Sequence, residues 1–134
     1  MISKCFPAKT EKLDDAIAFV EAELEKIDCP MKSVMQITVC VEEMFVNVAS
    51  YAYEGQPGEI ELSIDDEHDT VTIALTDTGV PFDPLAKEDP DITLSAEQRG
   101  IGGLGIFMVK KSMNEVRYER KGDRNIFTMV KYIR

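Results

Sequence analysis

The sequence predicts an α+β fold in which helices pack on one face of a mixed, mostly antiparallel sheet. Two observations lead to this prediction. The first part of the chain carries two helical stripes of apolar residues, and the later part alternates apolar and polar residues in short segments that pair as hairpins. A chain of 134 residues is long enough for one hydrophobic core, so we expect a single domain over residues 1–134.

The N-terminal part predicts an edge strand followed by two helices. Residues 2–6 alternate weakly and favour the strand. Thr10 is placed to cap a helix that ends before Pro30, and apolar residues recur in that helix at intervals of four and three: Leu13, Ile17, Val20, Leu24 and Ile27. A second helix over residues 33–52 has its own apolar stripe: Val34, Ile37, Val41, Met44, Phe45 and Val48.

The later part predicts two hairpins on either side of a long polar segment. Residues 59–64 and 71–76 alternate in the manner of strands, and the acidic loop 65–69 joins them and holds His68 in an exposed position. Residues 83–101 are polar and longer than an ordinary connection, which is typical of a functional loop such as a lid. A helix over 104–113 and a closing hairpin of strands 116–120 and 126–133 complete the chain.

The last predicted strand carries apolar residues on both of its faces. Thr128 shares one face with Ile126 and Val130. The other face is partly apolar as well, because it carries Phe127, Met129 and Ile133. We therefore expect this second face to be covered, for example by a second subunit.

Composition and charge exclude several classes of protein. The net charge of −10 argues against nucleic acid as a ligand, because phosphate contacts need a basic surface. The apolar runs are too short to span a membrane, and the N-terminus lacks the apolar stretch of a signal peptide, so we expect a cytoplasmic protein. Cys5, Cys29 and Cys40 are an odd number without a paired spacing, which predicts free thiols.

Glu43 and Asn47 lie one turn apart on the second predicted helix, at the border of its apolar stripe. At about 100° per residue their side chains project about 40° apart, so both can address one ligand. The amide oxygen of Asn47 can bind Mg²⁺, and Glu43 can act as a base toward a hydroxyl or a water. The alternative is a solvated glutamate and an asparagine that helps to end the helix.

Asp77 directly follows the strand predicted at 71–76 and opens the segment D-T-G-V-P-F, which ends at Phe82. A carboxylate at this strand end can accept a hydrogen bond from the exocyclic amine of adenine. Guanine presents an oxygen there and would be disfavoured. Gly79 permits a backbone turn that brings the chain close to the base. The segment alone also fits an ordinary Asp-Thr-Gly turn.

Residues 100–105 read G-I-G-G-L-G, which formally matches the dinucleotide-binding fingerprint. That fingerprint needs a preceding strand in a βαβ unit, and here a polar segment precedes the glycines. A P-loop motif is also absent from the sequence. What remains is glycine-rich backbone at a helix N-terminus, which can hold phosphate or simply serve as a flexible connector. Arg99 can add a cation for a terminal phosphate or be a surface residue.

In this order, these three segments resemble the N, G1 and G2 boxes of the GHKL ATPase superfamily, which includes gyrase and the catalytic domains of histidine kinases. The resemblance covers nearly the whole chain and implies the Bergerat α/β sandwich with ATP and Mg²⁺ as ligands. It implies that Glu43 is the general base, Asn47 the magnesium ligand and Asp77 the adenine-reading acid. The other nucleotide-binding positions that it implies are Gly79, Phe82, Arg99, Gly102, Gly103, Leu104, Gly105 and Thr128.

Within the superfamily the chain most resembles the small anti-sigma-factor serine/threonine kinases of the RsbW type. This resemblance implies a homodimer that binds a sigma factor and phosphorylates a small STAS-like antagonist, which regulates transcription by partner switching. The segment after Asn47 lacks the basic residue or histidine that relatives often have, which leaves the partner open. Two alternatives are a nucleotide-dependent binding module without significant kinase activity and a histidine-kinase fragment. The fragment is disfavoured because no upstream helix carries a phosphoaccepting histidine.

Overall fold

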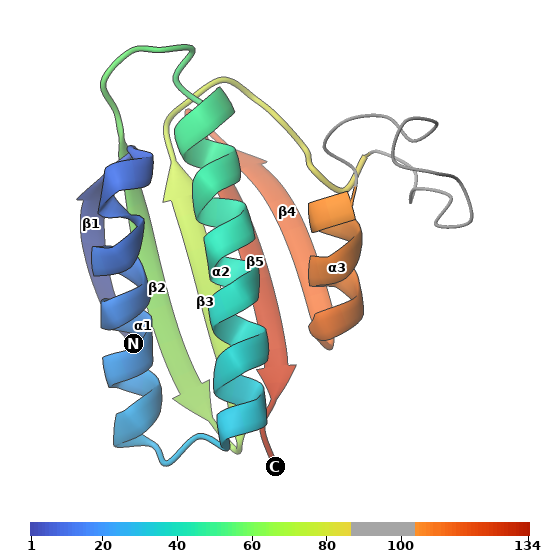
Figure 1. Ribbon diagram of the computed structural model, residues 1–134. Helices are drawn as coiled ribbons and strands as arrows, with labels where there is room; N and C mark the ends of the chain where they lie inside the picture. The colour runs from blue at the N-terminus through green and yellow to red at the C-terminus, as the bar shows by residue number, and fades with distance from the viewer. Residues whose placement is uncertain (87–103) are drawn as a thin grey trace.

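The computed structural model describes residues 1–86 and 104–134, and its elements follow the predicted order (Figure 1). The predicted lid therefore lies mostly outside the described residues. The elements are strand β1 (Ile2–Pro7), a 3-10 helix η1 (Thr10–Lys12), helices α1 (Leu13–Lys26) and α2 (Met31–Tyr51), strands β2 (Glu59–Glu67) and β3 (Thr70–Asp77), helix α3 (Leu104–Ser112), and strands β4 (Glu115–Lys121) and β5 (Arg124–Tyr132).

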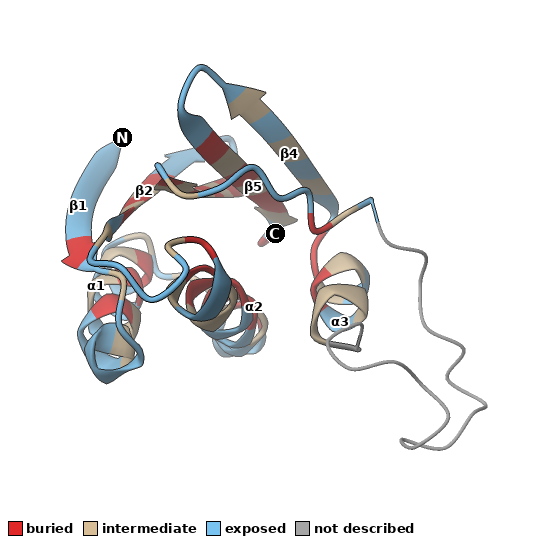
Figure 2. Cartoon of the chain, turned by 90° about the horizontal axis from the view of Figure 1, so that it is seen from above, coloured by how far each residue is buried: buried red, intermediate tan, exposed pale blue. Residues whose placement is uncertain are grey.

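The five strands form one sheet in the order β1-β2-β3-β5-β4, and every neighbouring pair is antiparallel. The helices cover one face of this sheet (Figure 2), so the predicted α+β layer is confirmed. Strands β3 and β5 are neighbours although they are far apart in sequence. Their register places Asp77, at the end of β3, opposite Asn125, near the start of β5.

The core lies between the sheet and the helices, with α2 over the middle strands (Figure 1). Each strand contributes every second side chain to this layer, because successive side chains of a strand point to opposite faces. The predicted stripes of both long helices supply the opposite side of the core. Among the buried residues are Val20, Leu24, Ile37, Val41, Met44, Phe45, Ile60, Leu62, Ile73 and Leu75.

Two of the predicted boundaries are wrong. Thr10 does not cap α1: it begins the 3-10 turn through which the chain leaves β1, and its hydroxyl donates to the carboxylate of Glu11 at 3.3 Å. The predicted loop 65–69 is a two-residue turn of His68 and Asp69, with φ of 50° and 60°. Such a turn matches the twist of a hairpin, so the polar residues before it remain in β2.

The expectation that the second apolar face of the last strand is covered is confirmed, but helices of the same chain cover it in place of a second subunit. Phe127 and Met129 are buried, at 4% and 1% exposure, in the layer under the helices of the same chain. Thr128 and Ile126 alternate with them and lie on the opposite face, which the helices leave uncovered (Figure 2). That face was therefore covered as expected, but by α2 and α3.

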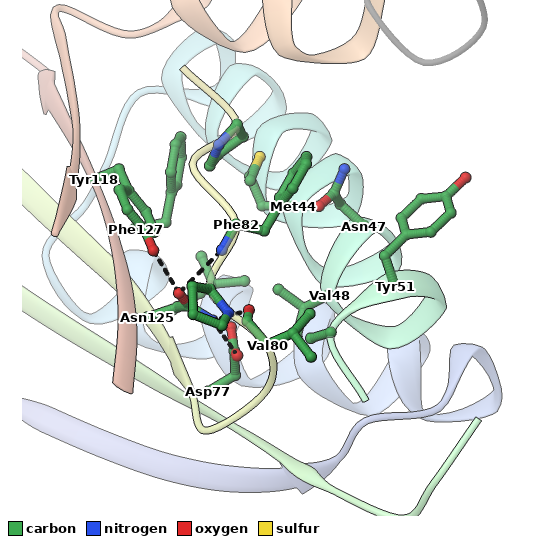
Figure 3. A pocket seen from close by; sticks show the side chains of 14 residues that line it. Met44, Asn47, Val48, Tyr51, Asp77, Val80, Phe82, Tyr118, Asn125 and Phe127 are labelled. Atoms are coloured by element: carbon green, nitrogen blue, oxygen red, sulfur yellow. Dashed lines mark hydrogen bonds between the residues drawn. The ribbon is translucent and has the colours of Figure 1, made fainter. Parts of the chain in front are cut away.

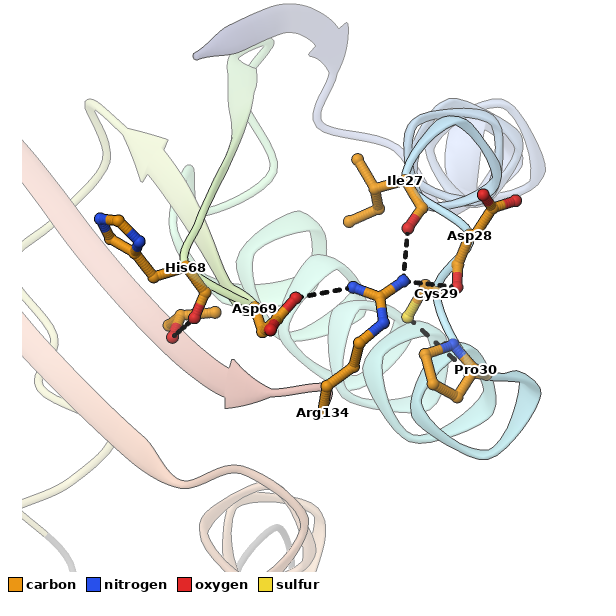
Figure 4. A network of polar contacts seen from close by, with 8 residues as sticks. Ile27, Asp28, Cys29, Pro30, His68, Asp69 and Arg134 are labelled. Atoms are coloured by element: carbon orange, nitrogen blue, oxygen red, sulfur yellow. Dashed lines mark hydrogen bonds and ion pairs between the residues drawn. The ribbon is translucent and has the colours of Figure 1, made fainter.

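Arg134 connects the end of α1 with the turn between β2 and β3 (Figure 4). Its guanidinium donates to the carbonyl oxygens of Ile27 (2.8 Å) and Asp28 (2.9 Å) and forms an ion pair with Asp69 at 2.9 Å. The carbonyl groups at a helix end have no partner inside the helix. The arginine therefore satisfies the carbonyl at the helix end and the next one beyond it, and it fixes this corner of the fold.

Three smaller expectations concern membranes, cysteines and histidine. Among the described residues, no helix is long and apolar enough to cross a membrane. All three cysteines are free, and Cys40 is buried whereas Cys5 is exposed. His68 is exposed in its turn and lies 3.5 Å from the carboxylate of Glu67. The predictions of free thiols and of an exposed histidine are confirmed.

Candidate functional site

The described residues form a cleft between the C-terminal half of α2 and the sheet (Figure 3). Its volume is about 550 Å³ with its open mouth included. Its walls are mostly apolar with a few polar groups at the floor, as is usual for small-molecule sites. The lining residues are Met44, Asn47, Val48, Tyr51, Ala52, Leu75, Asp77, Val80, Pro81, Phe82, Pro84, Tyr118, Asn125 and Phe127.

Asp77 is the buried acid of this cleft. It is the last residue of β3 and is 5% exposed. Its Oδ1 accepts hydrogen bonds from the backbone N–H of Gly79 and from the side-chain amide of Asn125, both at 2.9 Å. No described residue donates to Oδ2. The carboxylate is therefore held through one oxygen and can accept a hydrogen bond from a ligand with the other.

Asn125 fixes both Asp77 and the loop that follows it (Figure 3). Its Nδ2 donates to Asp77 Oδ1 at 2.9 Å and to the backbone carbonyl of Val80 at 2.8 Å. Its Oδ1 accepts from the hydroxyl of Tyr118 and, at 3.4 Å, from the backbone N–H of Phe82. An asparagine amide offers two donors and two acceptor positions. All four are used, so the amide has one orientation that satisfies its neighbours.

Gly79 is needed because the loop packs closely against α2. A Cβ at this position would lie 2.2 Å from the carbonyl oxygen of Ala52. The same carbonyl accepts a hydrogen bond from the N–H of Val80 at 2.8 Å. On the other side, Arg120 donates to the carbonyl of Gly79 at 2.9 Å. The predicted turn is present, and glycine is required there by contact with the end of α2.

Asn47 lies at the edge of the cleft, and Glu43 lies outside the cleft on the side of α2 that faces α3. Asn47 is half-buried, lines the cleft and makes no side-chain hydrogen bond to any described residue. Glu43, one turn earlier, is exposed, and a Cβ on Gly105 would lie 2.3 Å from its Oε2. The structure therefore brings the predicted carboxylate against the first turn of α3, with the amide one helical turn away.

Apart from Thr128, the remaining predicted nucleotide-binding residues lie in the cleft lining, at the start of α3 or outside the described residues. Phe82 lines the cleft and is 40% exposed as a residue. Leu104 is the first residue of α3, which places the start of this helix beside Glu43. The predicted phosphate contacts of Arg99, Gly102 and Gly103 lie outside the described residues.

Thr128 is not brought to the cleft. Its Cα pairs with Ala74 in β3, and its side chain lies on the sheet face opposite to Asp77. The polar residue of β5 that reaches Asp77 is Asn125, three positions earlier and on the other face. Sequence reasoning missed Asn125 because it stands at the predicted turn. Only the pairing register of β3 with β5 identifies it.

Two tyrosines that the sequence did not single out support the loop around the cleft. Tyr118 donates to Asn125, as described above. Tyr53 accepts a hydrogen bond from the N–H of Thr78 at 3.0 Å and donates to the carbonyl of Glu59. A buried tyrosine ring needs a partner for its hydroxyl. Here each hydroxyl is used to hold the segment that carries Asp77.

Comparison with known families identifies the class of protein. The profile of the histidine kinase-like ATPase domain matches residues 6–131, which is nearly the whole chain. The chain therefore belongs to the family of histidine kinase-like ATPase domains.

Two named protein kinases have sequences similar to this chain. The chain is similar to the serine/threonine-protein kinase BtrW of Bordetella bronchiseptica, with 26% identity over 97 residues, or 72% of this chain and 68% of that protein. It is also similar to the serine-protein kinase RsbW of Listeria monocytogenes, with 26% identity over 133 residues, or 95% of this chain and 83% of that protein. These findings confirm the predicted resemblance to the RsbW type.

Solved structures show the same fold. The structure of the RsbU and RsbW domains of Rv1364c from Mycobacterium tuberculosis superposes with a TM-score of 0.65 and 12% identity, over 99% of this chain and 33% of that chain. The chain thus spans about a third of that solved chain. The nucleotide-free catalytic domain of histidine kinase ThkA superposes with a TM-score of 0.58 and 16% identity, over 99% and 97%. At these identities the likeness establishes the fold, and it confirms the predicted Bergerat sandwich.

Proposed function

We propose that the cleft binds ATP, with the adenine between its apolar walls and the exocyclic amine on Oδ2 of Asp77. The observation that supports this most strongly is the state of that carboxylate: two donors hold Oδ1, and Oδ2 remains available inside a mostly apolar cleft. Guanine would place a carbonyl oxygen against the same oxygen, and two acceptors would face each other without a proton. The site is therefore expected to prefer adenine.

On this proposal the phosphates lie toward Glu43 and the first turn of α3. Asn47 would hold Mg²⁺ through its amide oxygen, which suits a hard cation and makes no hydrogen bond to a described residue. A single protein ligand is consistent with a Mg²⁺ site of this kind, because Mg²⁺ at nucleotide sites takes its other ligands from waters and the substrate phosphates. The bound ion would neutralise phosphate charge. Arg99, Gly102 and Gly103 are proposed as further phosphate contacts.

The proposal extends to a serine/threonine protein kinase of the anti-sigma type, which the kinase names of the relatives support. Glu43 would accept the proton of the acceptor hydroxyl as that oxygen bonds to the γ-phosphorus. The bond between the γ-phosphorus and the bridging oxygen breaks, and ADP leaves. A STAS-like antagonist as acceptor, a sigma factor as second partner, a homodimer and a cytoplasmic location complete the proposal. These parts derive from the family resemblance.

A nucleotide-dependent binding module is the second candidate function, and one observation favours it. Glu43 is exposed and does not line the cleft, whereas Asp77 and Asn47 do. Nucleotide could therefore bind and change the shape of the protein without any transfer of phosphate. The two candidates differ only in whether the Glu43 carboxylate does chemistry.

The test is magnesium-dependent transfer of radiolabelled γ-phosphate from ATP to small proteins of the host. Wild type is compared with Glu43→Ala and with Glu115→Ala, a matched loss of an exposed glutamate at the start of β4, away from the cleft. The kinase proposal predicts a labelled protein that disappears with Glu43→Ala and remains with Glu115→Ala. Normal ATP binding without any labelled product would refute the kinase proposal and favour the binding module.

A further inference from the structure

A row of exposed apolar residues on α2 has no role in the proposed chemistry. Met31, Met35 and Val39 recur every four residues and are 71%, 62% and 55% exposed; we call them the α2 stripe. A helix at the surface of a domain normally carries polar residues on its outer side. The core does not use the α2 stripe, because another face of the helix is buried: Ile37, Val41, Met44, Phe45 and Val48.

Helix α1 packs next to α2 (Figure 2), and helical geometry places carboxylates of both helices along this side of the α2 stripe. The exposed Lys32, next to Met31 in sequence, lies on the other side of the stripe. The ring of Phe19 on α1 contacts Phe6 of β1, with ring centroids 5.9 Å apart, so that side of α1 faces the sheet edge. At about 100° per residue, Glu21 and Glu25 project roughly 200° and 240° round from Phe19, toward α2 and solvent. Glu42 continues the acidic margin on α2 itself. All three glutamates are exposed.

The chemistry of this surface indicates what it binds. Methionine side chains are flexible and polarisable, and they adapt to apolar partners of different shape. Apolar anchors spaced by one helical turn are how proteins dock an amphipathic helix. The glutamates alongside favour lysine and arginine on that helix. We propose that the α2 stripe docks a basic amphipathic helix of a partner protein, with its cationic side chains against the margin formed by Glu21, Glu25 and Glu42.

Charge distinguishes this occupant from two others. A second copy of the chain would bring two acidic margins together, and each chain already carries a net charge of −10. An anionic membrane surface would be repelled for the same reason. A basic partner helix gains from both features of the surface. This inference is independent of the proposed kinase chemistry, because none of its residues lines the nucleotide cleft.

The test uses a synthetic amphipathic peptide of leucine and lysine of about 18 residues, which is long enough to form a helix on binding. Its dissociation constant for the full chain is measured by calorimetry. Met35→Ser is compared with Met108→Ser, a matched loss of a half-exposed methionine on α3. We expect Met35→Ser to weaken binding about tenfold, as the loss of one buried methionine contact implies. Met108→Ser should change the dissociation constant less than twofold.

The electrostatic part has its own variant and control peptide. Glu21→Gln combined with Glu25→Gln should weaken binding several-fold and flatten its dependence on salt. A peptide of the same composition, with leucine and lysine scrambled so that no apolar face forms, should bind at least tenfold more weakly to wild type. Equal affinity of wild type and Met35→Ser, or equal binding of the scrambled peptide, would overturn the proposal. The proposal would also be overturned if Met35→Ser left peptide binding unchanged and weakened only self-association or binding to phosphatidylserine vesicles.

Discussion

The hydrogen bonds of Asn125 allow a quantitative test of how the cleft is built. Asn125→Ala removes one hydrogen bond to the carboxylate of Asp77, one to the carbonyl of Val80 and the acceptor of the Tyr118 hydroxyl, besides the longer contact of 3.4 Å from the N–H of Phe82, which is left out of the sum. A hydrogen bond to a charged group contributes about 2 kcal/mol and a neutral one about 1 kcal/mol, which gives about 4 kcal/mol. Water entering the open cleft will replace part of this. We therefore expect the free energy of unfolding to fall by about 2–3 kcal/mol.

The same substitution should affect nucleotide binding through Asp77. Without Asn125, the carboxylate keeps only the N–H of Gly79 as a donor and can rotate. We expect the affinity for ATP to fall about tenfold or more, with less change for GTP, because only adenine uses this oxygen. Urea unfolding followed by circular dichroism gives the stability, and calorimetry gives the two affinities. Tyr118→Phe is the control: it removes one hydrogen bond and should cost about 1 kcal/mol without changing ATP selectivity.

Two results would contradict these expectations for Asn125. One is a change in unfolding free energy below about 0.5 kcal/mol for Asn125→Ala, which is the size of a neutral surface substitution. The other is an unchanged preference for ATP over GTP in a variant that is clearly destabilised. The second result would mean that Asn125 holds the loop but does not position Asp77 for a ligand.

Three further predictions follow from single contacts. Gly79→Ala should lower the free energy of unfolding by about 1–3 kcal/mol in urea titrations, because its methyl group would meet backbone at the end of α2. The methyl group of Gly105→Ala would come nearest to the end of the flexible Glu43 side chain, so stability should change by less than about 1 kcal/mol while phosphotransfer falls. Unchanged transfer would contradict the proposed role of that carboxylate. Desolvation and two neighbouring glutamates raise the pKa of the Cys5 thiol, so its thiolate fraction at pH 7.5 is below that of a free cysteine. Iodoacetamide should therefore alkylate Cys5 slowly and faster as pH rises, and it should reach Cys40, whose pKa is raised by burial, only on unfolding.

The spacing of apolar residues predicted the order and type of the elements, because a helix buries one face along its length and a strand buries every second residue. The errors lie where local conformation decides. His68 and Asp69 make a tight turn with positive φ, which the acidic composition of the segment conceals. Thr10 is a good capping residue, but the chain enters α1 through a 3-10 turn, and that turn depends on how β1 joins the sheet.

The site was predictable in its linear motifs and not in its cross-strand contacts. Asp77 could be identified from a short segment because it ends a strand, and Asn47 because it lies one helical turn after Glu43 at the border of the apolar stripe. Thr128 was correctly grouped with Ile126 and Val130, yet both faces of β5 are partly apolar, so sequence could not tell which face meets Asp77. Asn125 reaches Asp77 only through the pairing of β3 with β5, which is not encoded in any local pattern.

Recognition of adenine by Asp77 is tested most directly by calorimetric titration of wild type with ATP and with GTP, both with Mg²⁺. Asp77→Asn is titrated in the same way, beside the matched variant Asp66→Asn, which changes an exposed aspartate on β2. We expect wild type and Asp66→Asn to prefer ATP by about tenfold or more and Asp77→Asn to lose this preference. Equal affinity of wild type for the two nucleotides, or the same preference in Asp77→Asn, would contradict recognition of adenine by Asp77.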